Sequence, residues 1–218
     1  MAEMRTEEEQ VQAIKDWWKN NGTSLLIGIA VALAIVFGWQ AWQNHQMQQR
    51  TEAASQFADL INAYSDESDE NRAETVAYVA ERLRDEYTDS AFAIYGMLML
   101  ARQQMMEQND AEAAIESLSW AQEKAGDSGP LALVIRNRLA RAHFAAEQYD
   151  QALSIIESVG EAGSFNAIFT ELRGDILLAQ GDRDGAREAY LAARDQNQQG
   201  RSGILELKLS DLGVGEGA

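Results

Sequence analysis

One long apolar segment decides what this chain can fold into. Residues Leu25–Trp42 read LLIGIAVALAIVFGWQAW and lie in a window, 20–49, that contains no Lys, Arg, Asp or Glu. With Thr23 and Ser24 as its first turn, the segment has about 20 residues, and as a helix it would extend about 30 Å, the thickness of a bilayer's hydrocarbon core. The sequence therefore predicts a single transmembrane helix over 23–42.

Tryptophans flank this segment on both sides. Trp17 and Trp18 precede it, and Trp39 and Trp42 stand at its end, where the two membrane interfaces would lie. A core helix of a soluble protein would seldom be apolar on every face over this length. A cleaved signal peptide needs small residues at its cleavage site, where this chain has two bulky tryptophans. We therefore expect an uncleaved membrane anchor.

The flanking charges predict the orientation of the span. Arg5, Lys15 and Lys19 precede it, whereas the 20 residues that follow it contain only Arg50. The positive-inside rule then places the N-terminus in the cytoplasm and residues 43–218 outside, which in a bacterium is the periplasm. The chain has no cysteine, which suits an oxidising compartment. We expect a single-pass protein of the bacterial inner membrane.

The charge of the chain excludes one class of partner. Its net charge is -17, and nearly all of this lies beyond the span. Such a surface repels nucleic acid, so we expect no nucleic-acid binding. Before the span, the tail 1–22 contains Thr6 and Glu9 at the spacing of a capping box, which predicts a short helix there. The exterior region 43–218 is long enough for one domain with a substantial core.

The exterior region is predicted to be entirely helical. The membrane helix continues outward, because Phe57, Leu60 and Ile61 keep a helical spacing up to the acidic loop 65–72. Short polar breaks then separate segments that are rich in strong helix formers. These segments are about 72–87, 89–108, 111–125, 130–147, 149–159, 164–180, 184–196 and 201–212. We found no convincing strand, so the fold class is all-α.

The breaks recur with a fixed period. The segment that starts at Leu139 aligns with the one that starts at Arg173 at an offset of 34 residues, the tetratricopeptide period. The aligned pairs are Ala140 with Gly174, Glu147 with Gly181, Ala152 with Ala186, and Ile156 with Tyr190. A looser copy starts at Leu100 and places Ala114 38 residues before Ala152. Three hairpins are enough for a stable stack, so we expect a tetratricopeptide-like solenoid closed by a C-terminal capping helix.

Three features together resemble a known family. They are the acidic tail EEEQVQAIKDWWKNNG, a single span that ends in GWQAWQNHQ, and repeats that close on LELKLSDL. This order resembles the YfgM-like ancillary subunits of the bacterial Sec translocon. The resemblance implies a periplasmic repeat domain beside the SecYEG channel, association with the membrane-anchored chaperone PpiD, and assistance to emerging secreted proteins. It also implies that the tail bears on a cytoplasmic response regulator.

No residue pattern indicates catalysis. His45 lies just outside the span and His143 lies on a repeat helix, and we interpret both as structural residues. The sequence GDRDG at 181–185 lacks the further acidic ligands of a calcium loop, and its place in the repeat explains it as a turn. We therefore expect no enzyme, no cofactor and no metal ion.

The repeat alignment also predicts a protein-binding surface. The first helices of stacked hairpins line the concave face, where the alignment pairs Asn137 with Glu171, Arg141 with Asp175, and Phe144 with Leu178 as three exposed layers. Alternatively, Arg141 neutralises one of the two carboxylates and Phe144 packs between hairpins.

Methionines suggest a second surface. Met97, Met99, Met105 and Met106 could form a flexible apolar surface for unfolded segments, or they could pack in the core.

Three functions fit these features. The first is a membrane-anchored adaptor, or chaperone-like subunit, of the Sec translocon that binds partner or emerging proteins at the periplasmic face. The second is a scaffold for another envelope assembly. The third is a signalling protein that sequesters a regulator through its tail.

Overall fold

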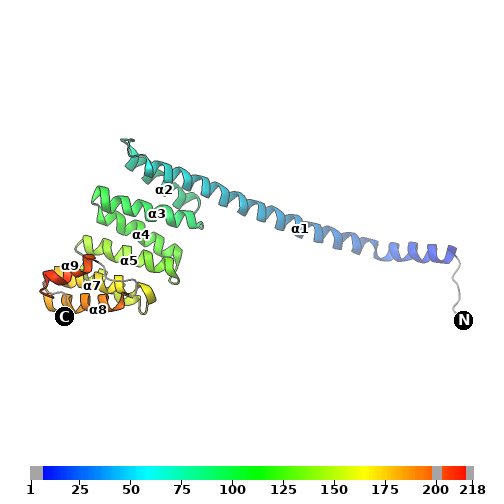
Figure 1. Cartoon of the computed structure of the whole chain (residues 1–218). Coiled ribbons are helices and arrows are strands. Elements are labelled where there is room, and N and C mark those ends of the chain that lie inside the picture. The colour runs from blue at the N-terminus through cyan, green and yellow to red at the C-terminus, as the bar shows by residue number, and fades with distance from the viewer. Residues whose placement is uncertain (1–6, 198–202, 215–218) are drawn as a thin grey trace. The chain divides into compact units, whose positions relative to one another are not determined.

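The computed structural model describes residues 7–197 and 203–214, and this part of the chain consists of helices and short connections (Figure 1). The prediction of an all-α chain is therefore confirmed. The chain divides into two compact units, Met1–Glu52 and Ala53–Ala218. Each unit is described by itself below.

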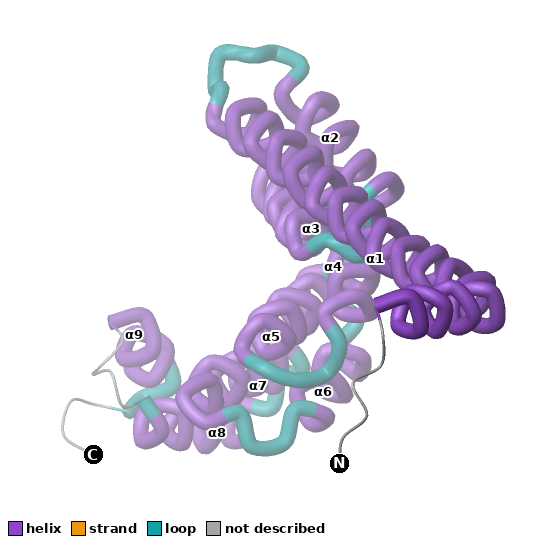
Figure 2. The backbone as a smooth tube through the Cα atoms, turned by 90° about the vertical axis from the view of Figure 1, so that its right-hand side faces the viewer, coloured by secondary structure: helices purple, strands orange, loops and turns teal. Residues whose placement is uncertain are grey.

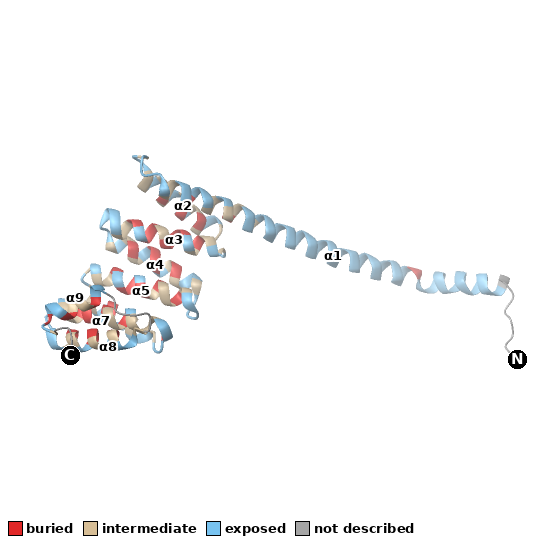
Figure 3. Cartoon of the chain, in the orientation of Figure 1, coloured by how far each residue is buried: buried red, intermediate tan, exposed pale blue. Residues whose placement is uncertain are grey.

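The first unit consists of most of helix α1 (Glu7–Ser65). The predicted span lies within α1, and its apolar side chains, from Leu25 to Trp42, are exposed on all sides of the helix (Figure 3). Only 6% of its most apolar window is buried, so this is not the core helix of a soluble domain. By length and composition, α1 is suited to cross a membrane.

Helix α1 also corrects one prediction and confirms another. From Glu7 onward the tail forms the first turns of α1 rather than a separate short helix, and Thr6, the predicted cap, lies outside the described residues. Beyond the span the helix continues without a break to Ser65, as the spacing of Phe57 and Leu60 predicted. From Ala53 onward, α1 belongs to the second unit.

The second unit is a series of helices joined by short turns (Figure 2). Their bounds agree with the predicted segments to within a few residues. The helices are α2 (Arg72–Glu86), α3 (Ala91–Gln103), α4 (Ala111–Ala125), α5 (Pro130–Ala145), α6 (Tyr149–Ser158), α7 (Asn166–Ala179), α8 (Arg183–Gln196) and α9 (Gly203–Asp211). A π-helical turn, Gln104–Gln108, extends α3, and a 3-10 turn, Gly163–Phe165, precedes α7.

Antiparallel hairpins α3/α4, α5/α6 and α7/α8 make the repeats, and buried positions show their equivalence. Six residues of α5 are buried, and each lies 39 positions after a buried residue of α3. The pairs are Ala93 with Ala132, Gly96 with Ile135, Leu98 with Asn137, Leu100 with Leu139, Ala101 with Ala140, and Gln103 with Ala142. Helices α3 and α5 therefore present equivalent faces to their neighbours.

The turns of the hairpins are also equivalent. Each turn contains one residue with a left-handed backbone: Asn109 (φ 53°), Glu147 (φ 60°) and Gly181 (φ 87°). Between α4 and α6 the offset is 38, as Ala114 and Ala152 predicted, whereas between α3 and α5 it is 39. The π-helical turn, which inserts one residue before Asn109, accounts for this difference.

The two helices of the third hairpin approach each other closely. Gly174 on α7 is buried, and a Cβ atom placed there would lie 2.4 Å from Cε1 of Tyr190 on α8. In the second hairpin, the aligned positions hold Ala140 and Ile156. Compared with the second hairpin, the third has a smaller residue on its first helix, Gly174, and a larger one on its second helix, Tyr190. The helices therefore still approach closely, as the alignment of small residues predicted.

Candidate protein-binding surface

The six predicted binding residues lie on the first helices of two hairpins. Asn137, Arg141 and Phe144 are on α5, and Glu171, Asp175 and Leu178 are on α7. The prediction that all six are exposed is wrong. Arg141 is exposed, whereas Asn137 has only 8% of its surface accessible and the other four are half-buried. The structure therefore divides the predicted surface into two parts with different contacts.

On α5, Asn137 positions Arg141. The Nε of Arg141 donates a hydrogen bond to Oδ1 of Asn137 at 3.1 Å, so the buried amide orients the exposed guanidinium. Phe144 packs against Tyr149, with 6.0 Å between the ring centroids, and joins the cluster around Ala140. The same cluster contains Leu172 and Ile176 of α7, so Phe144 packs between hairpins, as the alternative interpretation expected.

The two carboxylates on α7 form ion pairs with a lysine from the capping helix α9. The Nζ of Lys208 lies 2.7 Å from Oε1 of Glu171 and 2.7 Å from Oδ1 of Asp175. All three side chains are largely shielded from solvent. Arg141 therefore does not neutralise these carboxylates, contrary to the alternative interpretation.

Tyr190 lies beneath the same ion pairs. Its hydroxyl donates a hydrogen bond to Oδ1 of Asp175 at 2.8 Å, and its ring centroid is 5.5 Å from the Nζ of Lys208. Burial, followed by the hydrogen bond to Asp175, raises the pKa of the Tyr190 hydroxyl, so this group stays protonated as a donor. Leu178 packs against the cluster that Tyr190 forms with Leu209 of α9. Helix α9 thus contacts the α7 part of the predicted surface.

Lys208 was not among the predicted binding residues, because the segment LELKLSDL was interpreted only as a cap. Its signal in the sequence is a single lysine among Leu205, Leu207 and Leu209, a cation on a helix that packs against the stack. Leu205 and Leu209 are buried, whereas Leu207 is exposed. Positions 205, 208 and 209 lie on the same side of an α-helix, so Lys208 lies beside the two buried leucines and its side chain reaches α7.

The methionines divide between core and surface. Met97 is buried in the main core cluster, and Met99 and Met105 are half-buried against it. Met106, in the π-helical turn, has 78% of its surface exposed. The hypothesis of a methionine-rich surface is therefore wrong for Met97, and Met106 alone of the four is fully available.

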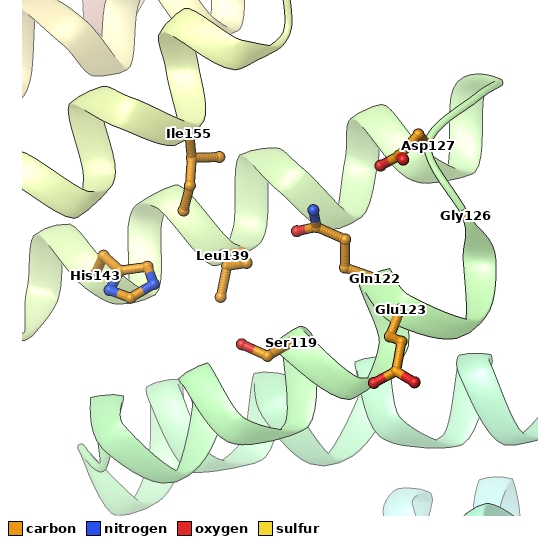
Figure 4. A pocket seen from close by; sticks show the side chains of 8 residues that line it. All are labelled: Ser119, Gln122, Glu123, Gly126, Asp127, Leu139, His143 and Ile155. Atoms are coloured by element: carbon orange, nitrogen blue, oxygen red, sulfur yellow. The ribbon is translucent and has the colours of Figure 1, made fainter.

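A separate groove lies between α4, α5 and α6 (Figure 4). It has a volume of about 590 Å³ and opens widely to solvent. Its lining mixes apolar and polar side chains: Ser119, Gln122, Glu123, Gly126, Asp127, Leu139, His143 and Ile155. Among the described residues, no three His, Asp or Glu side chains converge to hold a metal ion.

His143 in this groove makes structural contacts. Its Nδ1 lies 2.7 Å from Oε1 of Gln148, whose Nε2 donates a hydrogen bond to Oε1 of Glu112 at 2.7 Å. The imidazole thereby connects α5 to the first turn of α4 through the hairpin turn. These contacts agree with the interpretation of His143 as a hairpin residue.

Comparison with known proteins identifies the family. Residues 15–214 match the tetratricopeptide repeat-like domain family. The ancillary SecYEG translocon subunit of Haemophilus influenzae is 30% identical over 97% of this chain and 100% of its own length. The proteins of the same name from Escherichia coli and Neisseria gonorrhoeae are each 28% identical, over 95% and 97% of this chain and 97% and 100% of their own lengths. The chain therefore belongs to the tetratricopeptide repeat-like family of ancillary SecYEG translocon subunits.

Proposed function

We propose that this protein is a non-catalytic, membrane-anchored adaptor of the Sec translocon. One observation carries the proposal: a single chain joins an apolar helix, exposed on every side, to a stack of tetratricopeptide-like hairpins. Such a chain can fix a protein-binding domain at a membrane surface. The names of its relatives support SecYEG as the membrane partner.

The finer parts of the proposal concern what the repeats bind. In this proposal the repeat domain lies at the periplasmic face of the bacterial inner membrane, where it contacts the chaperone PpiD and proteins that emerge from the channel. The predicted residues Asn137, Arg141, Phe144, Glu171, Asp175 and Leu178 remain proposed for binding, with Arg141 as the exposed member. The cytoplasmic tail would be available to a response regulator.

Co-purification tests the association. We expect the full-length protein, tagged at its C-terminus and extracted in mild detergent, to retain SecY, SecE, SecG and PpiD. A matched control carries the same tag but replaces 23–42 with an unrelated apolar helix of equal length. Recovery of a division or cytochrome-maturation complex without Sec components would contradict the proposal and support the scaffold alternative. Loss of a co-purified regulator on deletion of residues 1–19 would identify a signalling role.

Cysteine labelling tests the orientation. The protein has no cysteine, so single variants report one site each. We expect Glu67→Cys, in the exposed loop after α1, to react with a membrane-impermeant maleimide in intact spheroplasts. Glu8→Cys should react only after lysis, because the basic residues before the span place the tail inside. The opposite labelling pattern would reverse the orientation and move the repeat domain to the cytoplasm.

A further inference from the structure

The repeat domain is acidic, yet five of its described arginines lack a carboxylate partner: Arg102, Arg138, Arg141, Arg173 and Arg183. Arg102 lies on α3, and Arg138 and Arg141 lie on α5, and none of them forms an ion pair with another described residue. Other arginines of the repeats do pair, as Arg136 does with Asp127 at 2.5 Å. In a chain with a net charge of -17, unpaired cations on two first helices require an explanation.

Arg102, Arg138 and Arg141 lie at exposed positions on the first helices of two hairpins. Arg102 and Arg141 are 39 positions apart, the offset that relates the buried residues of α3 to those of α5, so they occupy equivalent exposed positions. Arg138 precedes Arg141 by about one turn and is also exposed. Tyr95 and Met106 lie on the same stripe as Arg102, and 43% and 78% of their surfaces are accessible. We call Tyr95, Arg102, Met106, Arg138 and Arg141 the arginine face.

Two of the arginines are held in place by neighbours that leave their charge unneutralised. The hydrogen bond from Nε of Arg141 to Asn137 leaves both terminal nitrogens of the guanidinium available for a carboxylate. The Cζ of Arg102 lies 5.8 Å from the ring centroid of Tyr64, a cation–π contact. Because these side chains are already positioned, an incoming carboxylate loses less binding energy to the ordering of flexible groups.

The carboxylates of α7, the first helix of the third hairpin, are already paired and do not neutralise these arginines. Glu171 and Asp175 on α7 both bind Lys208 of α9, and Asp175 also accepts the hydroxyl of Tyr190. The capping helix therefore satisfies the acidic part of the predicted surface and leaves the basic part unpaired.

From this charge distribution we propose that the arginine face docks an acidic segment of a partner protein. Carboxylates of the segment pair with Arg102, Arg138 and Arg141, and an apolar side chain covers Tyr95 and Met106. Long polyanions such as nucleic acid are disfavoured by the surrounding negative charge, whereas a short segment needs only these few contacts. The proposal specifies the partner chemistry of the adaptor and rests on its proposed role in protein binding.

A peptide-binding measurement tests this proposal with the purified full-length protein in detergent. The probe is a short fluorescein-labelled peptide, amidated at its C-terminus, that contains alternating Glu, Leu and Ser. Its counterparts carry Gln or Lys in place of each Glu. We expect the Glu peptide alone to raise the fluorescence anisotropy, with binding that weakens as salt is added. Substitution of both Arg102→Gln and Arg141→Gln should lower its affinity at least about tenfold.

A control with equal loss of charge separates the face from general electrostatics. Arg82→Gln with Lys124→Gln removes two cations from α2 and α4, outside the arginine face, and should leave binding unchanged. Equal binding of the Gln peptide, equal losses in both double variants, or no binding at all would each overturn the proposal. So would sedimentation showing that the parent dimerises and the arginine variant does not, because a second copy would then occupy the face. Sec co-purification does not depend on any of these readings, so the two proposals fail separately.

Discussion

Replacement of Gly174 by Ala is expected to lower the free energy of unfolding of the repeat domain by about 1 to 3 kcal/mol. The new methyl group would lie 2.4 Å from Cε1 and 2.5 Å from Cδ1 of Tyr190, closer than carbon atoms can pack. Tyr190 cannot simply move aside, because it is 1% exposed and its hydroxyl is bonded to Asp175. Thermal unfolding followed by circular dichroism should show a fall of several degrees in Tm.

A second substitution should recover part of this loss. Tyr190→Ile combined with Gly174→Ala reproduces the pair that the second hairpin holds at Ala140 and Ile156. The double variant should therefore be more stable than Gly174→Ala alone, although it lacks the hydrogen bond of Tyr190. Gly96→Ala is the matched control, because its methyl group would meet the flexible end of Leu83 at 3.2 Å rather than a fixed ring. If Gly174→Ala unfolds at the same temperature as Gly96→Ala, the packing explanation is wrong.

The sequence predicted the hairpins well because their signals are local. Period, helix formers and small residues are visible along the chain, so Ala152 and Ala186 were aligned correctly and both are fully buried. The alignment showed a smaller residue at Gly174 and a larger one at Tyr190 than in the second hairpin. Only the structure shows that these two residues contact each other across the hairpin, so that the small one makes room for the large one. The extra residue in the π-helical turn shifted α3 against α5 by one position and could not be found from the offset of Ala114 alone.

The candidate surface was harder to predict because exposure depends on what else packs there. A position on a first helix can be open in one hairpin and covered in the next. Arg141 is exposed on α5, whereas the equivalent Asp175 on α7 is covered because α9 returns to the stack. Asn137 resembles a surface residue by its chemistry, yet it is buried and orients Arg141. Burial of this kind follows from the tertiary arrangement and not from local sequence.

Replacement of Lys208 by Met should destabilise the C-terminal end of the repeat domain by about 1.5 to 3 kcal/mol, the range for hydrogen bonds to charged groups. Methionine keeps an apolar stem against Tyr190 but removes the cation that holds Glu171 and Asp175. The two carboxylates, one turn apart on α7, would then repel each other in a place largely shielded from water. A lower Tm is expected. Amide hydrogen exchange should become faster than in the parent, and this increase should be larger in α9 than in α4.

Charge-matched variants distinguish loss of the ion pairs from loss of packing. Lys208→Arg keeps the cation and should retain more stability than Lys208→Met. Glu171→Gln and Asp175→Asn, added to Lys208→Met, remove the repulsion and should recover part of the loss. Arg82→Met is the control for one lost cation. Among the described residues Arg82 pairs with Glu86, one turn away on the same helix, and the Tm of this variant should match the parent. If the Tm of Lys208→Met equals that of Arg82→Met, the ion pairs of Lys208 do not stabilise the cap. The buried leucines of α9 then suffice to hold it, and repulsion between the two carboxylates of α7 costs no measurable stability.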